Sequence, residues 1–427
     1  MPHPRPPPPP RTPSPEPAGR RLAGPGAGAV TVAVAGAEFG WGSSGKLSAV
    51  LAALRGRAAR PLRFVGLASG LGRPLLAEHP IDRWYDLPGS AHDVPGALTD
   101  VVRAERVDAA VVVLDGAAAM ALETAGVPTV FVDSLPFLWT EGDRSALPLD
   151  VSAYCAQSCV ELPAECRGVL ESVRALHWVE AVIGTGPGAG AAPAAPAGPF
   201  RTALVSLGGL RAPHLGDWTP YPRLVVPAAL EALAAYGVRE VHVAGNLPAG
   251  TAEQIANGPA SAPVRVTAGA LSHSAFLRRL ADCDVLLASP GLTTLLEAGS
   301  LAVPTVCLPP QNLSQIFNGR FHSRAVRRDV RVVWPSGVFA EDEALALRAA
   351  GEDAALQVIY RGIAGAAAAP DRRRSTAGAV RDGVLAALHR ATPAADWGGL
   401  TGSVGTRGAA QVADTLLGIL PRAPLPA

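Results

Sequence analysis

The chain has 427 residues, more than one hydrophobic core usually supports, so we expect two domains. Its formal net charge of +1 gives no electrostatic basis for nucleic-acid binding. Charged residues make up only 17% of the chain, which suits buried parallel strands covered by helices. There is no apolar run long enough for a membrane span, and five cysteines, an odd number, favour reduced thiols. We therefore predict a soluble, cytoplasmic α/β protein with no membrane span and no nucleic-acid partner.

Composition divides the chain into five segments. Residues 1–29 are proline-rich and lack the apolar stretch of a secretory signal, so we predict a disordered tail. Residues 30–183 alternate strand-like and helical patterns, as a parallel α/β domain does. Residues 184–199 are a linker rich in Gly, Ala and Pro, and residues 200–385 repeat the alternation. Residues 386–427 form a C-terminal tail that contains one more predicted helix.

Short apolar runs predict the strands of both halves. These runs are Val30–Ala35, Arg63–Leu67, Ala109–Leu114, Pro128–Val132, Ala203–Leu207, Glu240–Ala244, Val264–Thr267, Val285–Ala288 and Thr305–Leu308. Parallel strands that alternate with helices bind ligands outside their carboxyl ends. We therefore predict two Rossmann-like, doubly wound domains that face each other across a cleft.

A glycine-rich turn, GWGSSGK from Gly40 to Lys46, follows the first predicted strand. Its glycines and lysine are spaced as in a P-loop, but Leu47 stands where a Ser or Thr would ligate magnesium. The run VVVLD, which ends at Asp115, is similar to the strand that carries a second metal-binding carboxylate. A P-loop-like NTPase or kinase is therefore one candidate. Residues 36–39 argue against it, because a true P-loop lies close behind its strand.

The segment from Asp282 to Gly319 is the most informative part of the sequence. It reads as a strand, a break at Pro290 and Gly291, a helix, a second strand and a polar loop. The first turn of such a helix has unpaired backbone N–H groups and the positive end of the helix dipole. A phosphate group suits that position.

These residues resemble the donor-binding segment of the two-domain (GT-B type) nucleotide-sugar glycosyltransferases, the group that contains the peptidoglycan N-acetylglucosaminyltransferase and the UDP-glycosyltransferases. The resemblance implies that Glu297 holds the ribose hydroxyls, and a carboxylate can accept bonds from two adjacent hydroxyls. It further implies that the second domain binds a UDP-sugar and the first a small-molecule acceptor, and that the predicted helix 409–420 crosses back to the first domain. The donor-binding residues that it implies are Gly208, Gly209, Arg211, Gly245, Asn246, Ser289, Gly291, Thr293, Thr294, Glu297, Gln311 and Gln315.

Inverting sugar transfer needs a base that takes the acceptor proton. Members of the family commonly place a His in the first glycine-rich loop, and this chain has none there. Glu38, just past the first strand, is our first candidate for the base, and Asp133, directly after the fourth, is the second. Without such a base the protein would be a non-catalytic nucleotide-sugar-binding protein. The residues demand no metal or other cofactor, because helix dipoles and backbone donors can stabilise a diphosphate.

The N-terminal half also resembles the cytosylglucuronate synthases of nucleoside-antibiotic biosynthesis, which join glucuronate from UDP-glucuronate to cytosine or hydroxymethylcytosine. The resemblance lies in VAGAEFGWGSSGKLSAVLAAL and in DSLPFLW, which begins at Asp133. It implies that Trp41 or Trp139 stacks on a flat base and that Arg211 pairs with the donor carboxylate. The acceptor-binding residues would be Gly40, Trp41, Gly42, Ser43 and Trp139.

Overall fold

The structure is a computed structural model. It describes residues 28–67, 70–88, 93–184, 199–211, 215–247, 250–261, 264–350 and 352–420. The predicted disordered tail up to residue 27 and the interior of the predicted linker lie outside these residues.

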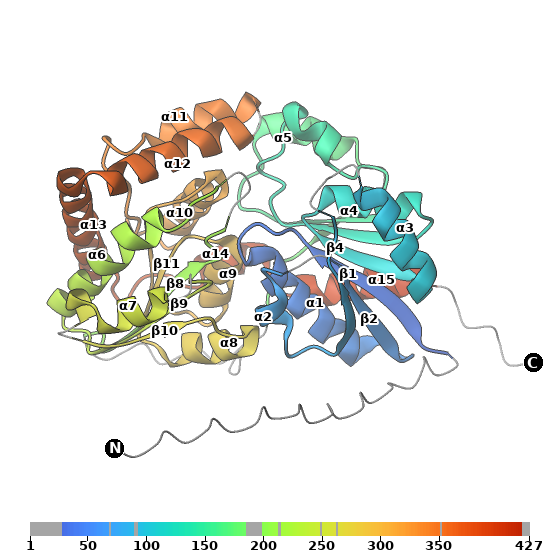
Figure 1. The fold of residues 1–427 in the computed structure, drawn as a ribbon, viewed down its shortest axis with the longest axis horizontal. Helices are drawn as coiled ribbons and strands as arrows, with labels where there is room; N and C mark the ends of the chain where they lie inside the picture. The colour runs from blue at the N-terminus through green and yellow to red at the C-terminus, as the bar shows by residue number, and fades with distance from the viewer. Residues whose placement is uncertain are drawn as a thin grey trace, which may run out of the picture.

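Two parallel sheets form the framework of the molecule (Figure 1). The first has the order β3-β2-β1-β4-β5-β6-β7 and the second the order β10-β9-β8-β11-β12. The strands of the first sheet are β1 (Val30–Gly36), β2 (Leu62–Leu67), β3 (Ile81–Tyr85), β4 (Ala109–Val113), β5 (Thr129–Asp133), β6 (Ala153–Gln157) and β7 (Leu176–Val179). Those of the second are β8 (Thr202–Gly208), β9 (Glu240–Gly245), β10 (Arg265–Gly269), β11 (Val285–Ala288) and β12 (Thr305–Cys307). The predicted fold class, two doubly wound α/β halves, is confirmed.

Helices cover both faces of each sheet. They are α1 (Gly42–Arg57), α2 (Arg73–Leu76), α3 (Val94–Glu105), α4 (Gly116–Thr124), α5 (Ala164–Glu171), α6 (Pro220–Tyr236), α7 (Thr251–Asn257), α8 (His273–Asp282), α9 (Leu292–Ser300), α10 (Leu313–Ala325), α11 (Glu341–Ala346), α12 (Glu352–Ala368), α13 (Pro370–Arg390), α14 (Gly399–Val404) and α15 (Gly408–Ile419). We call the first sheet with α1 to α5 and α15 the first unit, and the second sheet with α6 to α14 the second unit. None of the helices in the described ranges is long and apolar enough to cross a bilayer.

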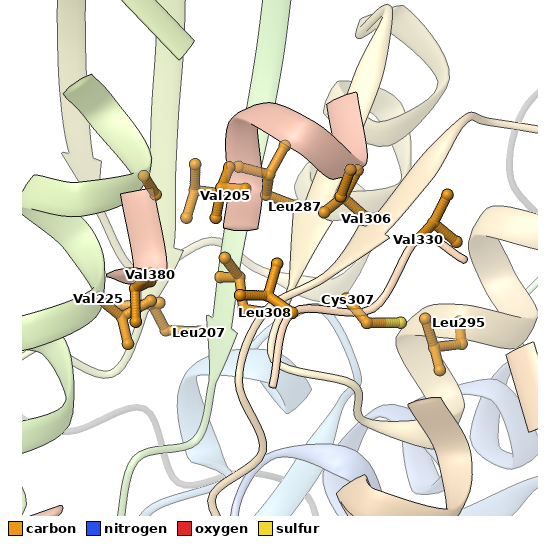
Figure 2. Packing of buried hydrophobic residues seen from close by; sticks show 14 of the residues in the cluster. Val205, Leu207, Val225, Leu287, Leu295, Val306, Cys307, Leu308, Val330 and Val380 are labelled. Atoms are coloured by element: carbon orange, nitrogen blue, oxygen red, sulfur yellow. The ribbon is translucent and has the colours of Figure 1, made fainter. Parts of the chain in front are cut away.

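The cores explain why these sequences form buried strands. In the first sheet, successive residues of a strand point to opposite faces and so enter different core clusters, as Val32 and Ala33 of β1 do. In the second unit, Val225 of α6 and Val380 of α13 lie beside Leu207 (Figure 2). The central strands of each sheet are therefore buried on both faces, which a nearly continuous apolar strand requires.

The chain crosses between the units twice. The first crossing leaves β7 and includes Gly184, and the second runs from α14 to α15. Helix α15 packs against α1 and places Val412, Ala413 and Leu416 in the core of the first unit (Figure 1). Residues from the end of the sequence thus complete the first unit.

Candidate functional site

A cavity of about 150 Å³ lies between the two units. Its wall comes from segments that follow the carboxyl ends of β1, β4 and β5 in one sheet and of β8 to β12 in the other. In open α/β sheets ligands bind where the strand order reverses, which here is beside β1 and β8. The polar residues in the wall are Ser43, Lys46, Ser134, Ser206, Arg211, His273, Ser289, Thr293, Thr294, Glu297, Gln311, Asn312, Ser314, Gln315, Asn318 and Tyr360.

Two helices begin at this cavity. Helix α1 starts after Trp41 and α9 starts after Gly291, and neither first turn has a side-chain cap. The two ends touch, since Thr293 Oγ1 donates to the carbonyl of Gly42 at 3.3 Å. Backbone N–H groups and two positive dipole ends therefore converge on one space, which favours an anion there.

Lys46 adds a cation to the same place. It is the only lysine of the chain, it is 2% exposed, and its Nζ donates to Thr293 Oγ1 of the second unit. Burial lowers the pKa of Lys46 to about 8, although the carboxylate of Glu297 acts in the opposite direction. The ammonium reaches across the interface to the other unit, and Leu47 is buried in the apolar core. This arrangement gives no support to a P-loop with a magnesium ligand at residue 47.

Glu297 is connected to the first unit by hydrogen bonds through the side chains of His273 and Ser48. Its Oε1 is 2.7 Å from His273 Nε2 and also accepts from the backbone N–H of Gly184 at 3.5 Å. His273 Nδ1 is 2.9 Å from Ser48 Oγ, which is in turn 2.8 Å from His79 Nε2. Oε1 of Glu297 makes both the His273 and the Gly184 contacts. Oε2 is therefore the oxygen of this wall residue that a ligand in the cavity can use.

The polar loop before α10 is held in a fixed shape. Gln311 Nε2 donates to Ser289 Oγ at 3.0 Å, and the backbone N–H of Gln311 donates to Gln315 Oε1 at 2.8 Å. Asn318 Nδ2 donates to the carbonyl of Pro290 at 3.0 Å, and its Oδ1 is buried without a partner. A buried acceptor without a partner destabilises the protein, so Asn318 Oδ1 suits a ligand that donates a hydrogen bond.

Neither predicted base reaches the cavity. Asp133 is fully buried, and its oxygens accept from Leu135 N–H, Trp139 Nε1 and the Tyr154 hydroxyl. Burial raises the pKa of Asp133 to about 6, against these three hydrogen bonds, yet no space for an acceptor adjoins it. Glu38 is exposed and lies outside the cavity wall. In this structure Asp133 organises the turn after β5 and Glu38 faces solvent, and the assignment of either residue as the base stays a prediction.

Three other predicted residues also lie outside the cavity wall. The indole N–H of Trp139 donates to Asp133 at 2.9 Å, and its stacking on an acceptor stays a prediction. Gly245 ends β9, and Asn246 Oδ1 accepts from the backbone N–H of Leu210 at 2.6 Å. Asn246 therefore holds the turn after β8 through this bond, without lining the cavity itself. Trp41 does line the cavity, and its Nε1 donates to the carbonyl of Leu71 at 2.9 Å.

The cysteines form no metal site in the part of the chain that the structure describes. Cys155, Cys159 and Cys166 are free, and Cys166 Sγ donates to the carbonyl of Phe137 at 3.3 Å. No group of three or more His, Cys, Asp or Glu residues in the described ranges could hold a metal ion.

The two units are closed on each other at one side of the cavity. The backbone N–H of Gly40 donates to the carbonyl of Arg211 at 3.1 Å, and a Cβ placed on Gly209 would lie 2.3 Å from the carbonyl carbon of Gly40. Pockets for small molecules usually measure roughly 300–1,000 Å³. The cavity must therefore widen before a nucleotide-sized ligand can enter, and the Gly40–Gly209 contact sets how closely the units approach when it closes.

No known family model matches this sequence, and no curated protein is similar to it. Among solved structures, the chain is similar to MurG of Acinetobacter baumannii, with 13% identity and a TM-score of 0.48 over 91% of this chain and 100% of that one. It is similar to a UDP-glucosyltransferase from Polygonum tinctorium, with 13% identity and a TM-score of 0.49 over 86% and 99%. It is also similar to the spinosyn rhamnosyltransferase SpnG, with 14% identity and a TM-score of 0.49 over 84% and 96%. At these values the similarities assign no activity to the chain.

Proposed function

We propose that the protein is a glycosyltransferase that moves a sugar from a nucleotide-sugar donor to a small-molecule acceptor with inversion. The observation that carries the proposal is the buried ammonium of Lys46 between the first turns of α1 and α9. The ammonium of Lys46 and the positive ends of α1 and α9 face one cavity. The negative charge of Glu297 raises the pKa of Lys46 there. A diphosphate supplies the negative charge that such a site requires.

The same groups give the site a catalytic role. When the sugar leaves the donor, negative charge develops on the departing diphosphate. Donors that are already fixed in a dry site stabilise that charge without reorganisation, which is usually the largest single contribution to catalysis. In this proposal Lys46 and the backbone N–H groups of residues 292–294 bind the diphosphate, and Glu297 Oε2 accepts from the ribose hydroxyls.

For the substrates, we propose glucuronate from UDP-glucuronate as the donor sugar and cytosine or hydroxymethylcytosine as the acceptor. Arg211 is exposed and lines the cavity, so its guanidinium can pair with the donor carboxylate. The ring of Trp41, also in the cavity wall, offers a flat apolar surface to a pyrimidine.

The test is UDP release from UDP-glucuronate and from UDP-glucose, each with and without cytosine, together with ADP release from ATP and magnesium. We expect UDP release that depends on both UDP-glucuronate and cytosine. Arg211→Ala should reduce the preference for UDP-glucuronate over UDP-glucose by about tenfold, the effect of one lost charge-assisted contact. Arg201→Ala, at an exposed arginine outside the cavity wall, is the matched control.

The outcomes separate the alternatives. ADP release that depends on magnesium, without any response to a UDP-sugar, would reject the glycosyltransferase in favour of an NTPase. Binding of UDP-sugars without transfer to any acceptor would favour a non-catalytic nucleotide-sugar-binding protein. Turnover with UDP-glucose alone, or with an acceptor other than a pyrimidine, would reject only the proposed substrates.

A further inference from the structure

Glu297 lies in the second unit, but a chain of hydrogen bonds connects its carboxylate to residues of the first unit. Ser48 and His79 belong to the first unit, and neither lines the cavity. Both are nonetheless linked to Glu297 through His273, and all four side chains are at least nine-tenths buried. Water cannot replace these bonds without opening the interface, so they hold the imidazole of His273 in one orientation.

The charges in this chain of bonds favour one arrangement of protons. Burial lowers the pKa of His273, but the carboxylate of Glu297 more than offsets this, and the pKa lies above its ordinary value. Glu78 also raises the pKa of His273, whereas Lys46 lowers it. Protonated His273 donates to Glu297 and to Ser48, and Ser48 then donates to His79 Nε2. Burial lowers the pKa of His79 to about 4, which suits a neutral acceptor at that position.

The bonds lie at the side of the interface where the chain crosses between the units. Gly184, on the first crossing, packs so closely that a Cβ there would be 2.7 Å from His273 Cε1. On the second crossing, Glu180 accepts from the backbone N–H groups of Thr406 and Arg407, both at 2.8 Å. The bonds from Glu297 to His79 are therefore anchored where the chain connects the two units.

We infer that His273, held by Ser48 and His79 of the first unit, is a positioning residue that sets the orientation of Glu297 for the donor nucleotide. This inference rests on the proposed function, because it assumes that Glu297 binds the donor. The first unit then takes part in donor binding in two ways, directly through Lys46 and indirectly through the orientation of Glu297. Without the Ser48 hydroxyl, the imidazole of His273 loses the bond that fixes its Nδ1 side.

The experiment measures UDP binding by calorimetry in the full chain. Ser48→Ala should raise the Kd for UDP about tenfold, since a fixed buried hydrogen bond is lost next to a charged pair. In the Glu297→Gln background the same change should have little further effect, because it acts through Glu297. Gly184→Ala displaces His273 from the other side and should resemble Ser48→Ala, whereas Ser48→Thr keeps the hydroxyl and should restore binding.

Ser274→Ala is the matched control. It removes a serine that also reaches across the interface, to the exposed carboxylate of Glu78, and Ser272 continues to hold that carboxylate, so its charge stays near His273. Its Kd should equal that of the wild type. Nitrogen-15 NMR should show a change in the ring signals of His273 in Ser48→Ala and none in Ser274→Ala.

Three results would overturn the inference. Wild-type affinity in Ser48→Ala would do so, as would a full, additive loss in the double variant, which would indicate general damage to the interface. In both cases the wild type still binds UDP, and the proposed function stands. A wild type that does not bind UDP would overturn the proposed function and this inference with it.

Discussion

The two glycine-rich turns that meet at the cavity differ in what they supply. The turn after β1 leads into α1 and brings the side chain of Lys46. Its ammonium is buried and donates to Thr293 of the second unit. The turn after β11 leads into α9 and brings backbone N–H groups and Glu297. Both turns therefore supply backbone N–H groups, and the first adds a cation while the second adds a carboxylate. A site divided in this way is complete only when both units are present and correctly spaced.

The spacing of the units should have the largest effect. Gly209→Ala places a Cβ against the backbone of Gly40, which cannot yield as a flexible side chain can. We expect the units to be held apart by about 1 Å and turnover to fall about a hundredfold, because misplacement of that size has such an effect. Steady-state UDP release measures it. Gly45→Ala is the control, since its Cβ meets Thr293 Cγ2 at an ordinary 3.5 Å. Equal rates in both variants would contradict the idea that Gly40 and Gly209 set the spacing.

Removal of the charge from the first turn should have the next largest effect. Lys46→Met keeps the length and loses the ammonium, and we expect the Kd for UDP to rise about thirtyfold, as for one strong charged hydrogen bond. Calorimetry with UDP and with uridine separates the charge from other effects, because uridine has no diphosphate. Its affinity should hardly change. A similar loss for uridine would mean that Lys46 acts through the shape of the site.

The last effect concerns stability rather than ligand binding or turnover. The pKa of Lys46 is about 8 in the folded protein and 10.5 in an exposed lysine, so the unfolded chain binds more protons between these pH values. Folding stability from this group is therefore lowest below pH 8 and rises as the pH increases towards 10.5. Lys46→Met should be more stable than the wild type at pH 7, by on the order of 3 kcal/mol, from about 1.4 kcal/mol for each pKa unit.

Urea unfolding of both proteins from pH 7 to pH 10 tests this dependence. The advantage of Lys46→Met should shrink steadily above pH 8. A difference that stays constant across this range would show that Lys46 is not a buried ammonium.

The sequence predicts most of the strands in the described ranges and misses two edge strands and β6, a buried strand of five residues. Every predicted strand corresponds to an observed one, because buried parallel strands are nearly continuous apolar runs. The prediction omits β3, β6 and β7. Strand β3 reads IDRWY and is half exposed, and β7 lies at the opposite edge with Trp178 47% exposed. Edge strands of this kind lack the pattern that marks a buried strand.

The candidate site also has a part that the sequence predicts and a part that it does not. The turns after β1, β8 and β11 were predicted to line the cavity because topology alone brings the carboxyl ends of strands together. The side-chain pairs across the interface could not be predicted, since Lys46 and Thr293 are 247 residues apart. His273, Ser48 and His79 were missed because each is an isolated residue without a motif. The sequence does not show that Asp133 bonds within the turn after β5, because a carboxylate after a strand looks the same whether it faces a ligand or a turn.

The return of α15 to the first unit has a consequence for how the protein is made. Val412, Ala413 and Leu416 fill the core beside α1, and Gln411 Oε1 accepts from the backbone N–H of Glu180 at 2.7 Å. During translation the first unit leaves the ribosome long before these residues exist. It must wait with part of its apolar surface open to water, while the whole second unit is synthesised and folds. The first unit is thus the half of this protein that most needs protection from aggregation in the cell.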